Sequence, residues 1–358
     1  MKILYGVTGE GMGHAIRSGV ILEHLIGTEQ HEVEILASNR AAKYLSERFG
    51  EVHTIHGLHI VTEDNRVKKG KTLWSNVREG LKNLPSQVEA YFELLEDFRP
   101  QAVISDFESF AYLYAKAHDL PIFSIDNQQL MSRCVVPDEV IGDQRADFEI
   151  VKAFVKAKLP FCDHYLIATF FEAPIRKKRT SLFGPILRPE ILDAPVSRGQ
   201  HLLVYQTTQE NHALVAALKK SGLEVRMYGM RRDIDADTRD DNIVHRPFSE
   251  TTFIEDLASA RAVIASAGFT LMGECVVMHK PLLAVPLEGQ FEQVLNARYL
   301  EHLGYGAMAE RVDDASLGAF LERCPDYERA LEPYRHDRNQ ALLAKLDELL
   351  DQAAAGLF

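Results

Sequence analysis

The sequence predicts a two-domain α/β protein with a mostly parallel sheet in each domain. Three observations support this prediction. The chain has 358 residues, which is long for a single α/β core. Strand-like and helical patterns alternate along it, and strands joined through helices run parallel, with helices on both faces of the sheet. The alternation also restarts near residue 200, after a proline-containing segment.

The first half contains strand-like apolar runs separated by helical patterns. In His14–Leu25, for example, Ile16, Val20 and Leu25 recur near helical spacing. The expected strands are Lys2–Thr8, Glu32–Ala37, Ala102–Ser105, Pro121–Ile125 and His164–Ala168. The expected helices are His14–Leu25, Trp74–Phe98 and Phe107–His118.

The second half repeats this organisation. The expected strands are Leu202–Tyr205, Glu224–Tyr228, Ala262–Ala265 and Leu282–Val285, and the expected helices are Glu210–Lys220, Phe269–Met278 and Gln290–Leu303. Phe183–Pro195 contains three prolines and is interpreted as the linker. We therefore expect domains at 1–183 and 184–338, with a C-terminal helix at 339–358 packing back on the N-terminal domain. Two such halves would enclose a cleft where the carboxyl ends of both sheets meet.

Composition excludes several classes of protein. The net charge of −12 argues against a general nucleic-acid binder. The four cysteines form no C-x-x-C pair, which argues against zinc and redox motifs. No apolar run approaches the ~20 residues needed to span a bilayer, and the N-terminus lacks signal-peptide features, so a cytoplasmic protein is expected. A basic cluster at residues 66–71, beside Trp74, leaves peripheral contact with a membrane or an anionic acceptor open, although a solvated loop is favoured.

A glycine-rich turn follows the first expected strand, in the order Thr8-Gly9-Glu10-Gly11-Met12-Gly13-His14. Glycines allow close approach of a ligand, and the helix start behind them favours phosphate, so Gly11 and Gly13 are candidate diphosphate-binding residues. The dinucleotide fingerprint is incomplete because His14 occupies the third glycine position. This argues against a nicotinamide or flavin enzyme, and no cofactor is expected.

His14 and Asp106 are the candidate catalytic pair. A histidine at a helix start tends to stay neutral, because the helix dipole disfavours its cation, and a neutral imidazole can accept a proton from a hydroxyl. Asp106 follows a buried strand and could orient His14 as in a catalytic dyad. Structural alternatives remain at this stage: His14 as a surface or capping residue, and Asp106 as the cap of a helix beginning at Phe107.

The segment Ser266–Glu274 carries the strongest signal of the second half. A small, glycine-containing turn that opens a helix is typical of a phosphate site. Glu274 lies one turn after Thr270, within reach of ribose hydroxyls of a nucleotide whose diphosphate binds at the helix start. A later segment, Glu292–Ala297, offers side chains that could bind sugar hydroxyls. Each piece also has a structural alternative, a simple turn or a solvated helix face.

Taken in order, these motifs resemble inverting GT-B glycosyltransferases. That group includes the peptidoglycan N-acetylglucosaminyltransferase and plant and antibiotic glycosyltransferases. An archaeal and bacterial subgroup shares the motifs that here read Gly9–Ser18, Gly184–Ile191 and Gly289–Ala297. The resemblance covers nearly the whole chain, and the late motif is the most specific. It implies a GT-B fold with two Rossmann-like, doubly wound domains.

The resemblance also implies roles for individual residues. His14 matches the histidine that activates the acceptor, and Asp106 its partner. The candidate diphosphate residues of the second half are Thr207, Ala267, Gly268, Phe269 and Thr270. The candidate base and ribose residues are Arg246, Phe248 and Glu274, and the candidate donor-sugar residues are Gln290, Glu292 and Gln293. The usual Gly-Gly-Ser loop is replaced here by Tyr205-Gln206-Thr207-Thr208, which puts the role of Thr207 in doubt.

The implied function is inverting transfer of a sugar from a nucleotide-diphosphate donor, a UDP-sugar, to an unidentified hydroxyl acceptor, without a metal. One metal candidate, the set His53, His56 and His59, is disfavoured because Gly57 breaks the helix that this spacing requires. Two alternatives stay open. A nucleotide-sugar hydrolase of the same fold has a loop similar to Gly11–Arg17, and a non-catalytic nucleotide-sugar sensor would bind without turnover.

Overall fold

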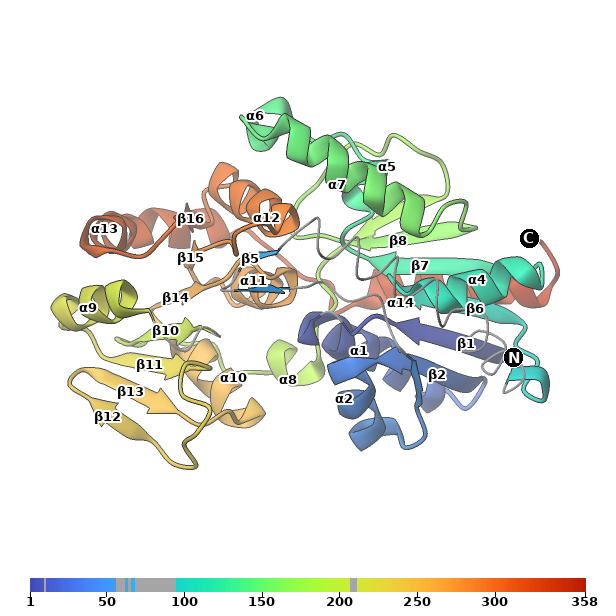
Figure 1. Ribbon diagram of the computed structural model, residues 1–358, viewed down its shortest axis with the longest axis horizontal. Coiled ribbons are helices and arrows are strands. Elements are labelled where there is room, and N and C mark those ends of the chain that lie inside the picture. The colour runs from blue at the N-terminus through green and yellow to red at the C-terminus, as the bar shows by residue number, and fades with distance from the viewer. Residues whose placement is uncertain (10, 56–61, 64–65, 68–94, 207–210) are drawn as a thin grey trace. The chain divides into compact units, whose positions relative to one another are not determined.

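The computed structural model describes residues 1–9, 11–55, 62–63, 66–67, 95–206 and 211–358 (Figure 1). The chain forms two compact units. Unit 1 contains Met1–Pro137, Asp143–Arg188 and Asp337–Phe358, and unit 2 contains Asp138–Gly142 and Pro189–His336. The chain therefore enters unit 2 briefly at residue 138, before the main crossing at residue 189, and returns to unit 1 at its C-terminal end.

A 7-stranded sheet forms the centre of unit 1, in the order β3-β2-β1-β6-β7-β8-β9, and every neighbouring pair is parallel. Its central strands are buried apolar runs, as expected for a sheet covered on both faces. The strands are β1 (Lys2–Val7), β2 (Glu32–Ser38), β3 (His53–Ile55), β6 (Ala102–Asp106), β7 (Ile122–Asp126), β8 (His164–Ala168) and β9 (Thr180–Phe183). A separate antiparallel pair joins β4 (Thr62–Glu63) to β5 (Arg66–Val67).

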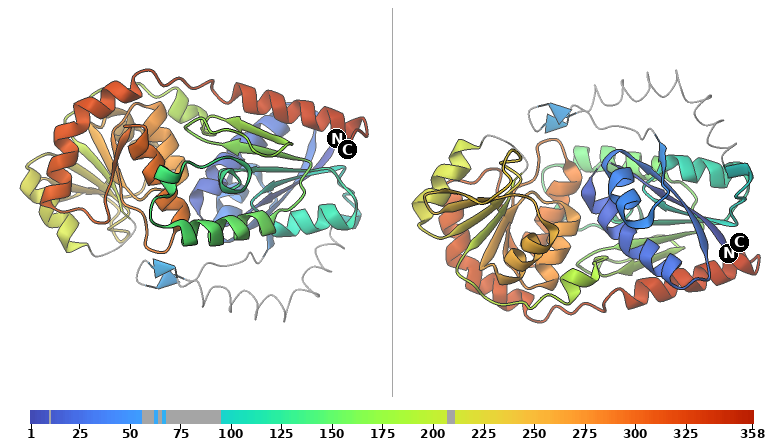
Figure 2. Two further views of the ribbon diagram at one scale, coloured as in Figure 1. Left: turned by 90° about the horizontal axis from the view of Figure 1, so that it is seen from above. Right: turned by 90° about the horizontal axis from the view of Figure 1, so that it is seen from below.

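Helices cover both faces of this sheet. In Figure 2, α4 and α7 lie on one face, and α1, α2 and the C-terminal α14 lie on the other. The helices of unit 1 are α1 (Met12–Gly27), α2 (Asn39–Phe49), α4 (Ser109–Ala117), α5 (Leu130–Arg133), α7 (Arg145–Lys158) and α14 (Gln340–Ala354). Contact between α14 and α1 includes a 2.8 Å bond from His24 Nε2 to Asp347 Oδ1. The Asn339 side chain also bonds both backbone groups of Leu187.

The strand order of unit 1 reverses between β1 and β6. The chain runs outward from β1 through β2 to β3 and then returns to the opposite side of β1 as β6. Ligands of open α/β sheets bind outside the carboxyl ends of the two strands at such a reversal. The loops after Val7 and Asp106, which are directly paired residues, are therefore the expected binding region of this unit.

Unit 2 contains a second 7-stranded sheet, in the order β12-β13-β11-β10-β14-β15-β16. Only the edge strand β12 is antiparallel to its neighbour. The strands are β10 (Leu202–Tyr205), β11 (Val225–Tyr228), β12 (Thr238–Asp240), β13 (Ile243–Arg246), β14 (Ala262–Ala265), β15 (Leu282–Ala284) and β16 (Gly306–Met308). Here the order reverses between β10 and β14, so the loop after β14 lies at the reversal point.

Five longer helices and two short ones complete the described part of unit 2. They are α6 (Asp138–Ile141), α8 (Pro189–Leu192), α9 (His212–Ser221), α10 (Glu250–Ser259), α11 (Phe269–Val277), α12 (Phe291–His302) and α13 (Asp314–Leu331); α6 packs against α12. Apolar side chains of α9 and α13 share one buried cluster with β10 and β11. Arg298 of α12 bonds the carbonyls of Val140 and Ile141, which fastens α6 to this unit.

The predicted α/β class with two parallel sheets is confirmed, and the boundaries need some corrections. The helix expected to begin at Phe107 begins at Ser109, because Phe107 has a left-handed φ of 54°. The expected helix Trp74–Phe98 lies almost entirely outside the described residues. Strands β9, β12, β13 and β16 were not predicted, since each is only three or four residues long and lacks a strong apolar pattern.

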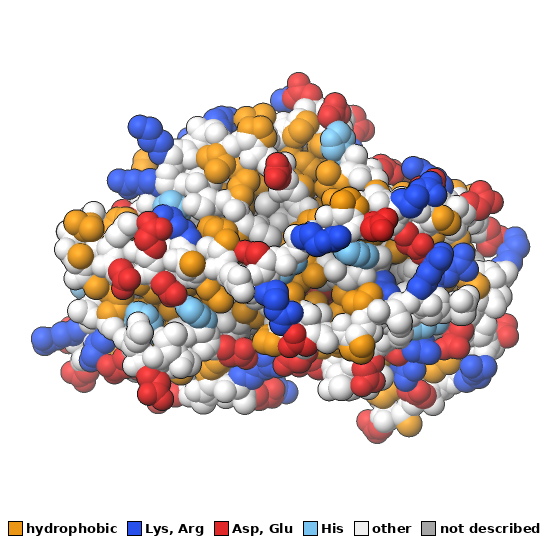
Figure 3. All heavy atoms as spheres, turned by 180° about the vertical axis from the view of Figure 1, so that it is seen from behind, with side chains coloured by type: hydrophobic (Ala, Val, Ile, Leu, Met, Phe, Trp, Pro, Cys, Tyr) orange, Lys and Arg blue, Asp and Glu red, His pale blue; other side chains and the backbone are white. Residues whose placement is uncertain are grey.

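Charged side chains of both signs intermingle on the face drawn in Figure 3. Within the residues that the structure describes, no helix is both long and apolar enough to cross a membrane.

Candidate functional site

The turn after β1 leads directly into α1. Gly9 is required there, because a Cβ atom at this position would lie 2.1 Å from the carbonyl oxygen of Ser38. The Gly9 amide donates to Ser38 Oγ at 2.7 Å, which ties the turn to the end of β2. Gly11 is the N-cap of α1 and supplies no side-chain cap, and Gly13 lies in the first turn. The His14 amide donates to the Gly11 carbonyl at 3.3 Å, and no side chain caps the helix start, so its earlier amides suit an anionic ligand.

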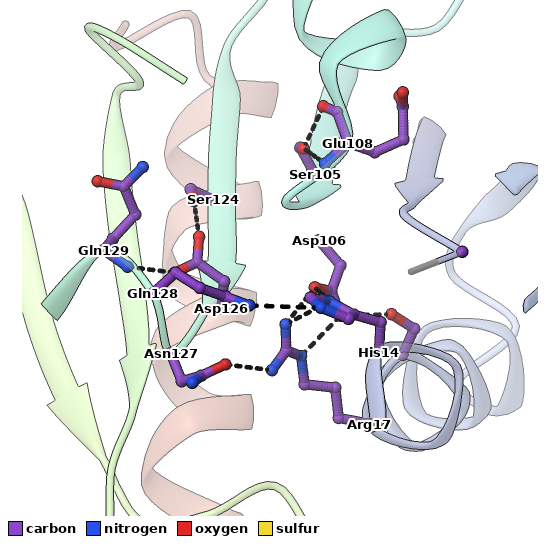
Figure 4. A network of polar contacts seen from close by, with 12 residues as sticks. His14, Arg17, Ser105, Asp106, Glu108, Ser124, Asp126, Asn127, Gln128 and Gln129 are labelled. Atoms are coloured by element: carbon purple, nitrogen blue, oxygen red, sulfur yellow. Dashed lines mark hydrogen bonds and ion pairs between the residues drawn. The ribbon is translucent and has the colours of Figure 1, made fainter. Parts of the chain in front are cut away.

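His14 and Asp106 lie in direct contact, as Figure 4 shows. His14 Nδ1 is 2.7 Å from Asp106 Oδ1, and the exposed fractions of the two side chains are 13% and 0%. The contact joins the first turn of α1 to the last residue of β6. When Nδ1 carries the proton and donates to the carboxylate, Nε2 is the ring nitrogen that can accept a proton.

Asp106 also binds Arg17 and Ser18, one turn further along α1. Arg17 donates through Nε to Asp106 Oδ2 at 2.7 Å and through Nη2 to Oδ1 at 2.5 Å, while Ser18 Oγ donates to Oδ2 at 2.8 Å. Arg17 Nη1 reaches Asn127 Oδ1 at 2.8 Å. Burial alone would raise the pKa of Asp106, but the Arg17 guanidinium and His14 lower that pKa to about 2, so the carboxylate is ionised at neutral pH.

The turn from β6 to α4 shows that Asp106 is not a helix cap. The N-cap of α4 is Glu108, whose carboxylate accepts the amides of Phe110 and Ala111, each at 2.7 Å. Between these two acids, Phe107 has a left-handed backbone, a strained conformation for a bulky residue. Its ring is held by Lys158, whose ammonium lies 4.2 Å from the ring centroid. The alternative that Asp106 caps a helix beginning at Phe107 is therefore wrong.

A second buried acid, Asp126, shapes the loop after β7. It accepts Ser124 Oγ and the Gln129 amide, both at 2.7 Å, and burial raises its pKa to about 6. The following residues face the site: Gln128 Nε2 lies 3.4 Å from His14 Nε2. Gln128 Oε1 is buried and has no hydrogen-bond partner among the described residues. An amide N–H directed at Nε2 favours the form of His14 in which Nε2 is unprotonated.

Arg17, Ser18, Asn127 and Gln128 were not predicted as site residues. Arg17 and Ser18 belong to the Gly9–Ser18 motif, and Arg17 is three residues after His14, so the two share one helix face. That spacing was a usable signal. No such signal exists in the sequence for Asn127 and Gln128, because their role depends on β7 lying next to β6.

In unit 2, the turn after β14 leads into α11. Ala267 is fully buried, Gly268 is the N-cap, and Phe269 and Thr270 begin the helix. No side chain caps this helix start. A Cβ atom added at Gly268 would meet no atom within 4 Å, so the space in front of the turn is open. A helix start whose amides are not capped by a side chain suits an anion such as a diphosphate.

The candidate base and ribose residues differ in exposure. Glu274 lies on α11 and is only 2% exposed. Phe248, in the loop after β13, is 71% exposed. Arg246 lies at the end of β13, and its guanidinium contacts Asp256 at 2.8 Å and Asp237 at 3.1 Å. These two acids already pair with the Arg246 guanidinium within unit 2.

The candidate donor-sugar residues surround the start of α12. Gln290 is the N-cap, and Glu292 and Gln293 lie in the first turn. Gln293 Oε1 accepts the Leu287 amide at 3.0 Å, and its Nε2 donates to Gln290 Oε1 at 2.6 Å. These bonds hold the loop before α12 in a defined shape.

Thr207 lies outside the described residues, as do His56 and His59. His53 contacts Glu34 at 2.5 Å between Nε2 and Oε2. Among the residues that the structure describes, no group of three or more His, Cys, Asp or Glu side chains is arranged to hold a metal ion.

Comparison with known protein families finds one match over most of the chain. The model of the family described as "Glycosyl transferase family 1" matches residues 1–325. The chain belongs to this family. An uncharacterised glycosyltransferase of Methanosarcina mazei is 25% identical over 337 residues, covering 86% of this chain and 85% of the relative. A Bacillus cereus UDP-N-acetylglucosamine–N-acetylmuramyl-(pentapeptide) pyrophosphoryl-undecaprenol N-acetylglucosamine transferase is 26% identical over 189 residues, covering 46% of this chain and 52% of the relative.

Solved structures show that this glycosyltransferase has the GT-B fold. The Medicago truncatula protein UGT71G1, in complex with UDP-glucose, matches with a TM-score of 0.67 and 12% identity over 98% of each chain. The calicheamicin glycosyltransferase CalG4 matches with a TM-score of 0.64 and 16% identity, again over 98% of each chain. The expected fold is thereby confirmed, and the family match together with the sequence relatives confirms the resemblance.

Proposed function

We propose that this glycosyltransferase transfers a sugar with inversion from a nucleotide-diphosphate donor, a UDP-sugar, to a hydroxyl acceptor, with His14 as general base. The observation that carries the proposal is the 2.7 Å contact between His14 Nδ1 and Asp106 Oδ1. It orients the imidazole so that Nε2 can take a proton from a hydroxyl. The cytoplasmic location stays an expectation from the sequence.

In the proposed reaction, an acceptor hydroxyl donates its proton to His14 Nε2 while its oxygen attacks the anomeric carbon. The bond from that carbon to the diphosphate breaks on the opposite face, so the anomeric centre inverts. Asp106 is ionised and interacts favourably with the imidazolium as it forms. A positioned base of this kind accelerates reactions by about 10²–10⁴-fold.

We assign the donor to unit 2. The N–H groups at the start of α11 would bind the diphosphate and stabilise its charge as it leaves, which is why the proposed reaction uses no metal. Glu274, one turn later, would bind the ribose hydroxyls, and Glu292 and Gln293 would bind the donor sugar. The UDP-glucose complex of the Medicago truncatula relative in fold supports a UDP-sugar as the first donor to test.

The proposal is tested by following nucleoside diphosphate release from a panel of UDP- and dTDP-sugars, with and without sugar and alcohol acceptors. A transferase releases the diphosphate faster when its acceptor is added, and NMR of the product shows an inverted anomeric centre. Rapid release that no acceptor changes would assign the protein as a nucleotide-sugar hydrolase. Binding without release would assign it as a sensor.

A further inference from the structure

Arg17 is a buried cation that contacts both members of the His14–Asp106 pair. We propose that Arg17 is a positioning residue: by neutralising Asp106, it keeps the His14 imidazole unprotonated, and therefore able to accept a proton, at neutral pH. The inference rests on the proposed base role of His14. Its test measures His14 directly, so the two proposals can fail separately.

The geometry places both charges on the same ring nitrogen. Arg17 Nη2 and Asp106 Oδ1 each lie 2.7 Å from His14 Nδ1. In the tautomer that leaves Nε2 free to act as base, Nδ1 donates its proton to Asp106, and Arg17 acts on the ring through its charge and not as a hydrogen-bond donor. The exposed fractions of the Arg17 and Asp106 side chains are 4% and 0%, so water screens this interaction little. Arg17 is fixed in place by its two bonds to Asp106 and its bond to Asn127.

An isolated carboxylate beside an imidazole favours the protonated ring, because opposite charges attract. Here the Arg17 guanidinium is as close to Nδ1 as the carboxylate is, so the two charges act on the ring with opposite signs. Arg17 therefore offsets much of the attraction that Asp106 alone would exert on a second ring proton, while Asp106 still accepts the Nδ1 proton of the imidazolium once it forms. A dyad without the arginine would leave a larger share of the base protonated, and inactive, near pH 7.

Other ionisable groups around this pair act less directly. Asp126, at the end of β7, interacts with Arg17 and Asp106 and is held by Ser124 and Gln129. Tyr5, on β1, is a neutral phenol whose pKa is raised by burial and by Asp106. On the Nε2 side, Gln128 is uncharged. Among the described residues, Arg17 is the cation in short contact with the ring, and removing its charge should have the largest effect.

The test is an NMR titration of the His14 ring in four proteins: wild type, Arg17→Gln, Asp106→Asn and the double variant. We expect the titration midpoint of His14 to rise by about 1–3 pH units in Arg17→Gln, the range for an opposite charge acting alone. It should fall in Asp106→Asn, where only the cation remains, and return close to the wild-type midpoint in the double variant. An unchanged or lower midpoint in Arg17→Gln would overturn the proposal.

Two controls separate charge from structure. Arg17→Lys retains the positive charge and should keep the midpoint near that of the wild type. His24, on the same helix and paired with Asp347, reports whether α1 is intact, and its ring resonances at a fixed pH should be unchanged in all variants. If Arg17→Gln does not fold, the comparison of Asp106→Asn with the double variant still measures the charge of Arg17, and equal midpoints in those two proteins would refute the proposal.

A kinetic readout then connects the charge to turnover. Once an acceptor is known, the acid limb of the Arg17→Gln rate profile should move upward by the same number of pH units as the NMR midpoint. A uniformly lower rate with an unmoved limb would indicate a merely structural role for Arg17. A shifted NMR midpoint with an unshifted rate profile would leave the charge effect intact and count against His14 as the base.

Discussion

Asp106 Oδ1 lies 2.7 Å from His14 Nδ1, although the two residues are 92 positions apart in the sequence. Parallel pairing of β1 with β6 brings them together, because Val7 is directly opposite Asp106 and the chain continues from Val7 into the turn before α1. The strand that carries the acid and the helix that carries the imidazole are thus adjacent by topology. The following predictions test what this arrangement and its counterpart in unit 2 do.

Replacing His14 by alanine should lower turnover by about 10²–10⁴-fold, because the acceptor hydroxyl then loses its positioned base. Affinity for the donor should change little, since we assign the donor to unit 2. Steady-state kinetics and calorimetry measure the two quantities. The matched control is His24→Ala, which removes another histidine of α1 in contact with an aspartate and should keep normal turnover. Wild-type rates in His14→Ala would mean that the base is another residue.

Gly268→Ala should weaken nucleoside diphosphate binding without loss of stability. The added methyl group meets no protein atom within 4 Å, and the φ of −69° is accessible to alanine, so the fold should tolerate it. A ligand bound closely against the turn would meet that methyl group. Calorimetry with UDP and thermal unfolding are the measurements.

Gly318→Ala is the control for this change, because it adds a methyl group to equally open space elsewhere in unit 2, on α13. It should leave UDP affinity unchanged. Equal UDP affinity in Gly268→Ala and the wild type would argue against a diphosphate at the start of α11.

Glu274→Ala should weaken UDP binding by roughly 1–3 kcal/mol, the scale of a lost hydrogen bond to a charged group. The side chain is only 2% exposed, so the fold of the variant must be checked by circular dichroism and thermal unfolding before affinities are compared. Glu274→Gln keeps the shape and one acceptor oxygen, and should lose less affinity. A folded Glu274→Ala protein that binds UDP normally would remove Glu274 from the ribose site.

Asp126 should make stability depend on pH in a predictable direction. Burial raises its folded pKa from 3.8 to about 6, so the folded state binds the proton more tightly than the unfolded state. Asp126 therefore contributes most to the free energy of unfolding below about pH 4. This contribution decreases as the pH rises through 6, by about 2–3 kcal/mol in total. Asp126→Asn cannot ionise and should avoid this loss.

The measurement for Asp126 is urea unfolding of the wild type and of Asp126→Asn at pH 4 and at pH 7. The stability of the variant relative to the wild type should increase between the two pH values, whatever other groups titrate, because those groups are common to both proteins. The same relative stability at both pH values would contradict the assigned shift.

Several features were predictable from the sequence because they depend on residues close together in the chain. The apolar runs of β1, β6, β7, β10 and β14 and the glycine turns before α1 and α11 have local patterns that short-range geometry explains. The same patterns placed His14 after β1 and Gly268 after β14. The glycine at position 9 was also recognisable as part of a turn. The reason that only glycine fits there, the close approach of the Ser38 backbone, was not predictable from the sequence.

The sequence by itself thus determined the α/β class, the parallel sheets, the family and the positions of His14, Asp106 and Gly268 along the chain. Only the tertiary structure decided that Glu108 and not Asp106 caps α4, that Arg17 shares the Asp106 carboxylate with His14, and that Asn127 and Gln128 complete the network. The periodicity of apolar residues predicts contacts only between residues that are a few positions apart in the chain. Contacts between residues 88–114 positions apart depend on strand order, and strand order is fixed by packing of the whole sheet.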